Sequence, residues 1–192
     1  MDFTSLPPFA AWRHRDARDC FEVVFVTAQN DGYDVNGHTA AVEDGEAWAV
    51  EYSITLDSSW ATRNAVVTGR SATGHHRVEL NADGAGSWRV NGDPVPLLDG
   101  CLDLDLESSS FTNTFPMHRL ALGIGKDVEA PAAYVRAVDL RVERLEQQYR
   151  LPAHATTHRV YYRAPVFDVE CELVFDESGL VLDYPGLATR IA

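Results

Sequence analysis

A run of polar residues between aromatic rings, FTNTFPMHR (111–119), is the stretch of sequence best suited to binding chemistry. Asn113 offers an amide, the threonines on either side of it offer hydroxyls, and Arg119 adds a guanidinium. Aromatic rings such as Phe111 pack against sugar rings or alkyl chains, while amide and guanidinium groups hydrogen-bond sugar hydroxyls or headgroup oxygens. The pattern predicts an amphipathic ligand, contacted by Phe111, Asn113 and Arg119.

The same residues have a purely structural interpretation. Buried Asn and Thr side chains often satisfy backbone groups at a bend, and aromatic residues are ordinary members of a core. The segment 108–120 follows the strand-like CLDLDLE (101–107), where the apolar alternation stops. It therefore either ties down a bend at the end of a strand or lines the mouth of a cavity, and both alternatives stay open.

Aromatic and polar residues stand side by side in three further places. WATR places Trp60 near Arg63, YYR contains Tyr161, and DYP contains Asp183 and Tyr184. By the same chemistry these residues are predicted to contact a ligand, provided that the fold brings them together.

Metal binding is not predicted. His154 and His158 are four residues apart, but on a strand their side chains lie about 13 Å apart, too far for one ion. His75 and His76 are adjacent and would point to opposite faces of a strand. The sequence also has no GxSxG motif and no glycine-rich phosphate loop, so no cofactor is predicted.

Carboxylates and thiols are the remaining candidates for catalysis. Asp103 and Asp105 alternate with leucines, and in so acidic a chain we interpret them as the solvated face of a strand rather than as an acid and a base. Cys20, Cys101 and Cys171 are far apart among apolar residues, which indicates free buried thiols. No catalytic residue is predicted.

The chain is strongly acidic, with 29 Asp and Glu against 16 Lys and Arg and a formal net charge of −13. Such a surface repels nucleic acids and anionic membranes. Lysine occurs only at Lys126, and an acid-rich, lysine-poor composition suits a salt-rich cytoplasm, which predicts a halophilic source. The N-terminal residues do not resemble a signal peptide, and no apolar run approaches the ~20 residues of a membrane helix. We expect a cytoplasmic protein without stable membrane insertion.

Period-two alternation predicts a mainly all-β fold. It is clearest in AWAVEYSITL (47–56), CLDLDLE (101–107) and FDVECELVF (167–175), while Asn91-Gly92 predicts a two-residue hairpin turn. No linker or repeat divides the chain, so one domain over residues 1–192 is expected. An antiparallel sheet of ten or more strands must curl or close, and its concave side is where a ligand site would form. Residues 139–149 fit a helix or a strand.

Two segments carry a resemblance to a known family. GCLDLDLESSSFTNTFPMHRL (100–120) and GLVLDYPGLATR (179–190) resemble the putative glycolipid-binding proteins, formerly a family of unknown function. Trp12 and the WATR segment (60–63) fit the beginning of that family's pattern. His118 and Ser110 depart from it, since an arginine and a proline are usual at those positions.

The resemblance implies a single curled antiparallel sheet, a spiral β-roll or incomplete barrel similar to the bacterial lipoprotein carriers. It therefore favours a strand for residues 139–149, and it implies a lipid or glycolipid ligand on the concave side. The residues expected to contact the headgroup are Arg63, Asn113, Arg119, Tyr161, Asp183 and Tyr184, and those expected along the apolar part are Trp12, Trp60 and Phe111.

Three functions follow, in this order of preference. The first is a protein that binds a lipid or glycolipid on the concave side of the sheet. The second is a structural or protein-interaction β domain without a small ligand. The third is an enzyme for a sugar- or lipid-like substrate, with Asp103 or Asp183 as acid or base and an arginine as anion holder.

Overall fold

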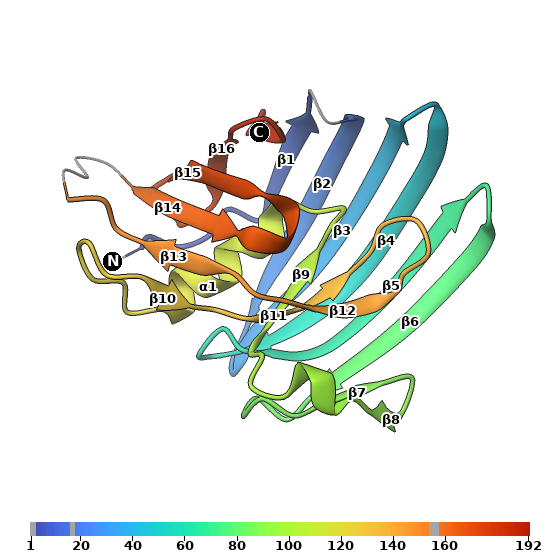
Figure 1. The fold of residues 1–192 in the computed structure, drawn as a ribbon, viewed down its shortest axis with the longest axis horizontal. Coiled ribbons are helices and arrows are strands. Elements are labelled where there is room, and N and C mark those ends of the chain that lie inside the picture. Colours follow the sequence, from blue (N-terminus) through green and yellow to red (C-terminus); the bar gives the residue numbers. More distant parts are fainter. Residues whose placement is uncertain (1–2, 16–17, 154–157) are drawn as a thin grey trace.

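The protein consists mainly of one large curled β-sheet (Figure 1). The structure is a computed structural model that describes residues 3–15, 18–153 and 158–192. Fourteen strands form an antiparallel sheet in the order β10-β13-β14-β15-β16-β17-β1-β2-β3-β4-β5-β6-β7-β8, and β12-β11-β9 form a second sheet. Within the described ranges the two ends of the large sheet do not pair with each other, so the sheet is open. The prediction of a mainly all-β, curled antiparallel fold is confirmed.

Long hairpins build one half of the large sheet. These strands are β1 (Phe9–His14), β2 (Asp19–Gln29), β3 (Gly32–Glu43), β4 (Glu46–Asp57), β5 (Thr62–Ser71), β6 (Gly74–Ala82), β7 (Trp88–Val90) and β8 (Asp93–Pro94). The other half is shorter and contains β10 (Val128–Glu129), β13 (Gln148–Arg150), β14 (Arg159–Ala164), β15 (Val169–Phe175), β16 (Val181–Tyr184) and β17 (Ala188–Arg190). Because β1 pairs with β17, the first and last strands join the two halves.

The alternation in the sequence sets which side chains face inward. In β4 the apolar members from Trp48 to Leu56 are all buried, while the residues between them face out. In β2 the inner face carries Glu22 between the buried Cys20 and Val24, whereas Phe21 and Phe25 on the outer face are 44% and 58% exposed. One side of β2 thus places a carboxyl group in the core, and the other side leaves rings on the outer surface.

The predicted turn at Asn91-Gly92 joins β7 to β8. Both residues have positive φ, 50° and 88°, as a two-residue turn of the I′ kind requires. Asn and Gly are the residues that adopt this backbone at least cost, which explains why the sequence signal is reliable here.

Residues 103–119 lie against the inner side of the large sheet, and we call this segment the plug (Figure 1). It contains β9 (Asp103–Leu106), the 3-10 turn η2 (Phe111–Asn113) and the short helix α1 (Thr114–Arg119). β11 (Ala132–Val135) and β12 (Val142–Leu145) extend β9 into the three-stranded sheet. Every residue from 108 to 117 is buried, so the plug occupies much of the space that the curled sheet encloses.

The interpretation of Asp103 and Asp105 as a solvated face is wrong: they are 1% and 8% exposed, because β9 pairs with β11 and is covered on both faces. Residues 139–149 form no helix but contribute to β12 and β13, which belong to different sheets. In the described part of the chain, no helix is long and apolar enough to cross a membrane.

Candidate functional site

A cavity of about 240 Å³ lies between the plug and the strands β14 to β16, and we call it the concave pocket. Its aromatic lining consists of Tyr134, Tyr162, Phe167 and Tyr184. Leu106, Leu145, Val169 and Leu187 supply the aliphatic lining, and its polar lining consists of Arg18, Glu43, Asp105, Glu107, Ser109, Asn113 and Arg136. The pocket therefore combines apolar walls with hydrogen-bond donors and acceptors, as small-molecule sites do.

Hydrogen bonds hold the polar groups at the base of the pocket. The hydroxyl of Tyr149 donates to Oδ1 of Asn113 at 3.0 Å, and the hydroxyl of Tyr162 donates to Oε1 of Gln147 at 3.0 Å. The rings of Tyr162 and Tyr184 meet edge to face with centroids 5.9 Å apart. Burial raises the pKa values of all three tyrosines, so these hydroxyls stay protonated and can donate.

Asp105 is a buried carboxyl group in the lining of the pocket. The Thr112 hydroxyl donates to its Oδ1 at 2.7 Å. Burial raises the pKa of Asp105 to about 6, since the Thr112 hydrogen bond and a backbone bond only partly offset the desolvation and the nearby charge of Asp103. Near neutral pH this carboxyl group therefore gains or loses a proton readily.

Two arginines and three glutamates surround the mouth of the pocket. Nη2 of Arg18 donates to the backbone oxygen of Glu107 at 2.7 Å, and its Nη1 lies 3.7 Å from the Glu43 carboxylate. Arg136 contacts Glu107 at 3.2 Å and Glu143 at 3.1 Å, with its guanidinium over the Tyr134 ring. The mouth is polar, and its positive groups are already paired.

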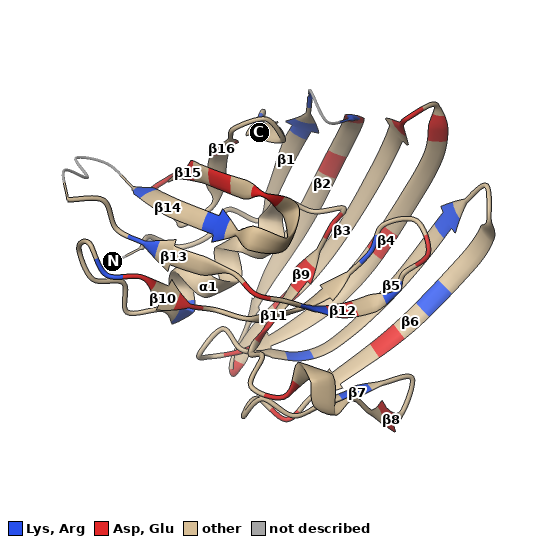
Figure 2. Cartoon of the chain, in the orientation of Figure 1, with Lys and Arg blue, Asp and Glu red and all other residues tan. Residues whose placement is uncertain are grey.

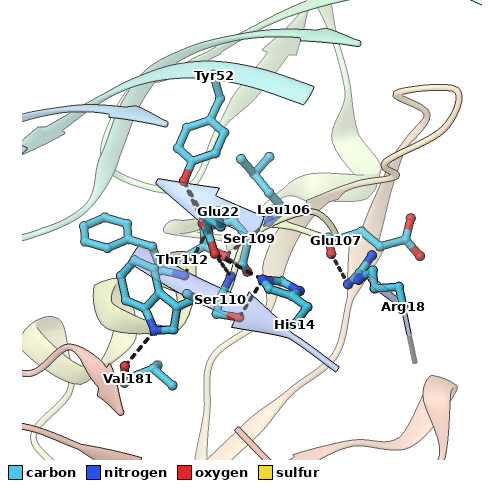
Figure 3. A network of polar contacts seen from close by, with 12 residues as sticks. His14, Arg18, Glu22, Tyr52, Leu106, Glu107, Ser109, Ser110, Thr112 and Val181 are labelled. Atoms are coloured by element: carbon cyan, nitrogen blue, oxygen red, sulfur yellow. Dashed lines mark hydrogen bonds and ion pairs between the residues drawn. The ribbon is translucent and has the colours of Figure 1, made fainter. Parts of the chain in front are cut away.

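A second polar cluster lies where the plug meets the large sheet, and we call it the closed cluster (Figure 3). The fully buried Glu22 accepts hydrogen bonds from the Tyr52 hydroxyl at 2.9 Å, the Ser110 amide at 2.8 Å and the Ser109 hydroxyl. Nε2 of His14 lies 3.4 Å from the same carboxylate. Both carboxylate oxygens are thus engaged, and the cluster fastens the plug to β1, β2 and β4.

Most of the predicted residues in and near the plug serve its packing. Arg119 forms a bidentate pair with the buried Asp103, with Nε–Oδ1 and Nη2–Oδ2 distances of 3.0 and 2.5 Å. This pair leaves Asp103 closed to a substrate. Trp12 and Phe111 are fully buried and meet edge to face at 6.1 Å, and the indole of Trp12 donates to the Val181 oxygen at 2.7 Å. Asn113 is the predicted plug residue that lines the concave pocket.

The predicted residues outside the plug are dispersed. Tyr184 lines the concave pocket. Tyr161 lies beneath the guanidinium of Arg150, 4.3 Å from it, and Asp183 accepts a hydrogen bond from Thr189 on the exposed side of the sheet.

Trp60 lies at the end of the plug that carries His118, and Arg63 lies near it on β5. The Trp60 indole stacks on the His118 ring with centroids 3.8 Å apart, and burial lowers the pKa of His118 to about 4. Arg63 is largely exposed, 3.5 Å from Asp57. The structure thus brings Asn113 and Tyr184 together in the concave pocket. Trp60 and Arg63 do not line that pocket.

No group of three metal-ligating side chains occurs among the residues that the structure describes, and His154 lies outside them. Burial raises the pKa values of Cys20 to about 12 and of Cys101 and Cys171 to about 11. The thiols are therefore poor nucleophiles near neutral pH.

The sequence interpretation missed Tyr162, although a signal for it was present. In β14, Tyr161 alternates with Arg159 and Arg163, whereas Tyr162 alternates with Val160 and Ala164. That pattern assigns Tyr162 to the inner face. Arg18 and Arg136 gave no comparable signal, because each reaches the pocket from a segment outside the predicted motifs.

A more open hollow of about 380 Å³ lies on the outer face of the sheet, and we call it the outer groove. Val23, Phe25, His38, Glu51 and Val66 are among its lining residues. It lacks the buried polar groups of the concave pocket, and of the predicted site residues none lines it.

The family model described as "Putative glycolipid-binding" matches residues 9–190. The chain belongs to this family, as the resemblance of its motifs predicted. A crystal structure of a DUF1089 family protein from Pseudomonas aeruginosa is similar to this chain, with 33% sequence identity and a TM-score of 0.75. The similarity covers 88% of this chain and 92% of that one. No curated protein matches the sequence.

Proposed function

We propose that this protein binds the headgroup of a glycolipid in the concave pocket and leaves the alkyl part of the ligand outside. The observation that carries the proposal is the lining of the pocket, where aromatic rings stand beside hydrogen-bond donors and acceptors. Sugar rings need both: apolar faces to stack on aromatic rings, and hydroxyls that donate as well as accept. Membership of the putative glycolipid-binding family supports the same ligand class.

The volume of the pocket favours a headgroup over a whole lipid. Pockets for drug-sized ligands measure about 300–1,000 Å³, and the concave pocket is smaller, at about 240 Å³. Among the residues that the structure describes, the plug fills the neighbouring space with buried side chains, which leaves little room there for an alkyl chain. Val166, which adjoins the lining residue Phe167, is 70% exposed and offers an apolar surface at the rim for such a chain.

Asn113 and Tyr184 have the central roles in this proposal. Oδ1 of Asn113 is occupied by the Tyr149 hydroxyl, so its Nδ2 group is the atom that donates to a ligand oxygen. Tyr184 adds a ring and a protonated hydroxyl to the lining of the same pocket. Arg63, Tyr161 and Asp183 have no part in this site, and Trp12, Phe111 and Arg119 act through the packing of the plug.

The test is mass spectrometry of organic extracts from protein purified gently from its native host. We expect one glycolipid per chain in the wild type and its loss in Asn113→Asp, which keeps the Oδ1 acceptor and removes the donor. Asn64→Asp is the matched control, because Asn64 bonds Asn81 on the exposed side of the sheet. Extracts without lipid from folded wild-type protein would contradict the proposal and favour the structural role.

A further inference from the structure

We infer that the headgroup recognised by the concave pocket carries no net charge, which makes the ligand a neutral glycoside rather than a phosphate-, sulfate- or ammonium-bearing lipid. The inference rests on the proposed function, since it assigns the ligand class of the same site. Its support is the pairing of charges around the pocket.

Each arginine that lines the pocket already has an anionic partner. Arg18 lies 3.7 Å from Glu43 and donates to the Glu107 backbone, and Arg136 lies between Glu107 and Glu143. Nε of Arg18 has no partner in the described ranges, but it is covered and does not reach the pocket. A phosphate would have to displace a glutamate from one of these pairs and would gain little from doing so.

The remaining charges around the pocket oppose an anion further. Its lining contains the carboxyl groups of Glu43, Asp105 and Glu107 against two guanidinium groups. Glu107 also accepts the Ala137 amide at 2.8 Å, which fixes its carboxylate in place. Figure 2 shows acidic positions on β9 and the segments near it, in a chain whose net charge is −13. A further anion in this confined space would meet repulsion that water screens only in part.

A cationic headgroup is no better accommodated. Aromatic rings attract a cation through their faces, but Arg136 already lies over Tyr134 and Phe167, 5.3 and 5.2 Å from their ring centroids. An ammonium group would lie close to that guanidinium and to Arg18. The aromatic surface that remains, on Tyr162 and Tyr184, suits the apolar face of a sugar ring.

A neutral polyol fits the pairs as they stand. Sugar hydroxyls can donate to the free lone pairs of Glu107 and Asp105 and accept from Nδ2 of Asn113 without separating any ion pair. The carboxylates and guanidiniums then act as strong hydrogen-bond partners, because a bond to a charged group is stronger than one between neutral groups. Recognition thus comes from the arrangement of donors and acceptors and not from net charge.

The experiment compares ligands that share an octyl chain and differ in headgroup. Octyl glucoside, octyl galactoside and octyl mannoside are titrated into the wild-type protein below their micelle concentrations, beside octyl phosphate and octyltrimethylammonium. We expect at least one glycoside to bind with a dissociation constant at least tenfold below those of both charged ligands. Equal or tighter binding of octyl phosphate or octyltrimethylammonium would overturn the inference and leave binding in the pocket intact. If none of the five ligands binds, both this inference and the proposed function fail.

A charge variant tests whether octyl phosphate is rejected because the arginines are paired with glutamates or because it does not fit the pocket. Glu43→Gln keeps an oxygen for the Trp48 indole but removes the negative charge beside Arg18. We expect octyl phosphate to bind this variant about fivefold more tightly than the wild type, as the loss of a partly exposed ion pair allows. Glu46→Gln is the control, because Glu46 lies in the same hairpin but is exposed and outside the pocket lining. The affinity of this variant for octyl phosphate should equal that of the wild type. An unchanged affinity in both variants would overturn the inference.

Discussion

The closed cluster and the concave pocket are two polar regions beside one plug, and they differ in what their polar groups contact. In the closed cluster the carboxylate of Glu22 is surrounded by protein donors. In the concave pocket Asp105, Asn113 and Tyr184 line a cavity. Ser109 belongs to both regions. Burial of polar residues therefore does not distinguish a site from a structural tie, whereas unfilled space beside those residues does.

The largest effect should come from the closed cluster. Glu22→Ala leaves the Tyr52 hydroxyl, the Ser109 hydroxyl and the Ser110 amide without their acceptor, so the free energy of unfolding should fall by about 3–5 kcal/mol. Urea denaturation measures this loss. Glu22→Gln keeps an acceptor oxygen and should lose less. A loss below about 1 kcal/mol in Glu22→Ala would show that the plug is held elsewhere.

The next effect is a pH dependence from the concave pocket. The pKa of Asp105 is about 6 in the folded protein and near 3.8 without its environment, so the folded state binds its proton more tightly. The contribution of Asp105 to the free energy of unfolding is complete below pH 4 and is lost as the pH rises to about 6. The difference between the two pKa values corresponds to about 3 kcal/mol. Urea midpoints from pH 4 to 7 measure it. Asp105→Asn should flatten this part of the profile, and an equal slope in that variant would assign the effect to another group.

A smaller effect should separate binding from stability. Tyr184→Phe removes one hydroxyl from the pocket wall, so the dissociation constant for the bound octyl glycoside should rise about five- to tenfold. The free energy of unfolding should fall by no more than about 1 kcal/mol, the usual contribution of one hydrogen bond. Tyr161→Phe is the matched control, because that ring lies under Arg150 and away from the pocket. Titration calorimetry compares the two, and equal losses would contradict the placement of the site.

The sheet could be predicted from the sequence because alternation is a local property. β4 and the Asn91-Gly92 turn each follow from a few neighbouring residues. In β2 the same alternation does not reveal which face is buried, since the phenylalanines face outward and Glu22 faces the plug. Only the distant Ser109 and Tyr52 explain why Glu22 is buried.

The site could be predicted only in part, because it depends on contacts between segments that are distant in the sequence. Asn113 and Tyr184 stand in conspicuous motifs, but Arg18 and Arg136 reach the pocket through tertiary contacts that their own segments do not indicate. The sequence predicts a solvated Asp105 because nothing in CLDLDLE shows that β9 is an inner strand whose residues are all buried. Helix α1 carries Pro116 in a segment of six residues, too short for a periodic signal.

An NMR titration of the wild-type protein with whichever octyl glycoside binds best, followed at the backbone amides, locates the binding site. Binding in the concave pocket should change the chemical shifts of Asn113, Arg136 and Tyr184 and leave those of Glu22 and Tyr52 unchanged. Shift changes confined to the outer groove, at Val23, Phe25 and Val66, would show that the ligand binds the other face of the sheet and not the concave pocket.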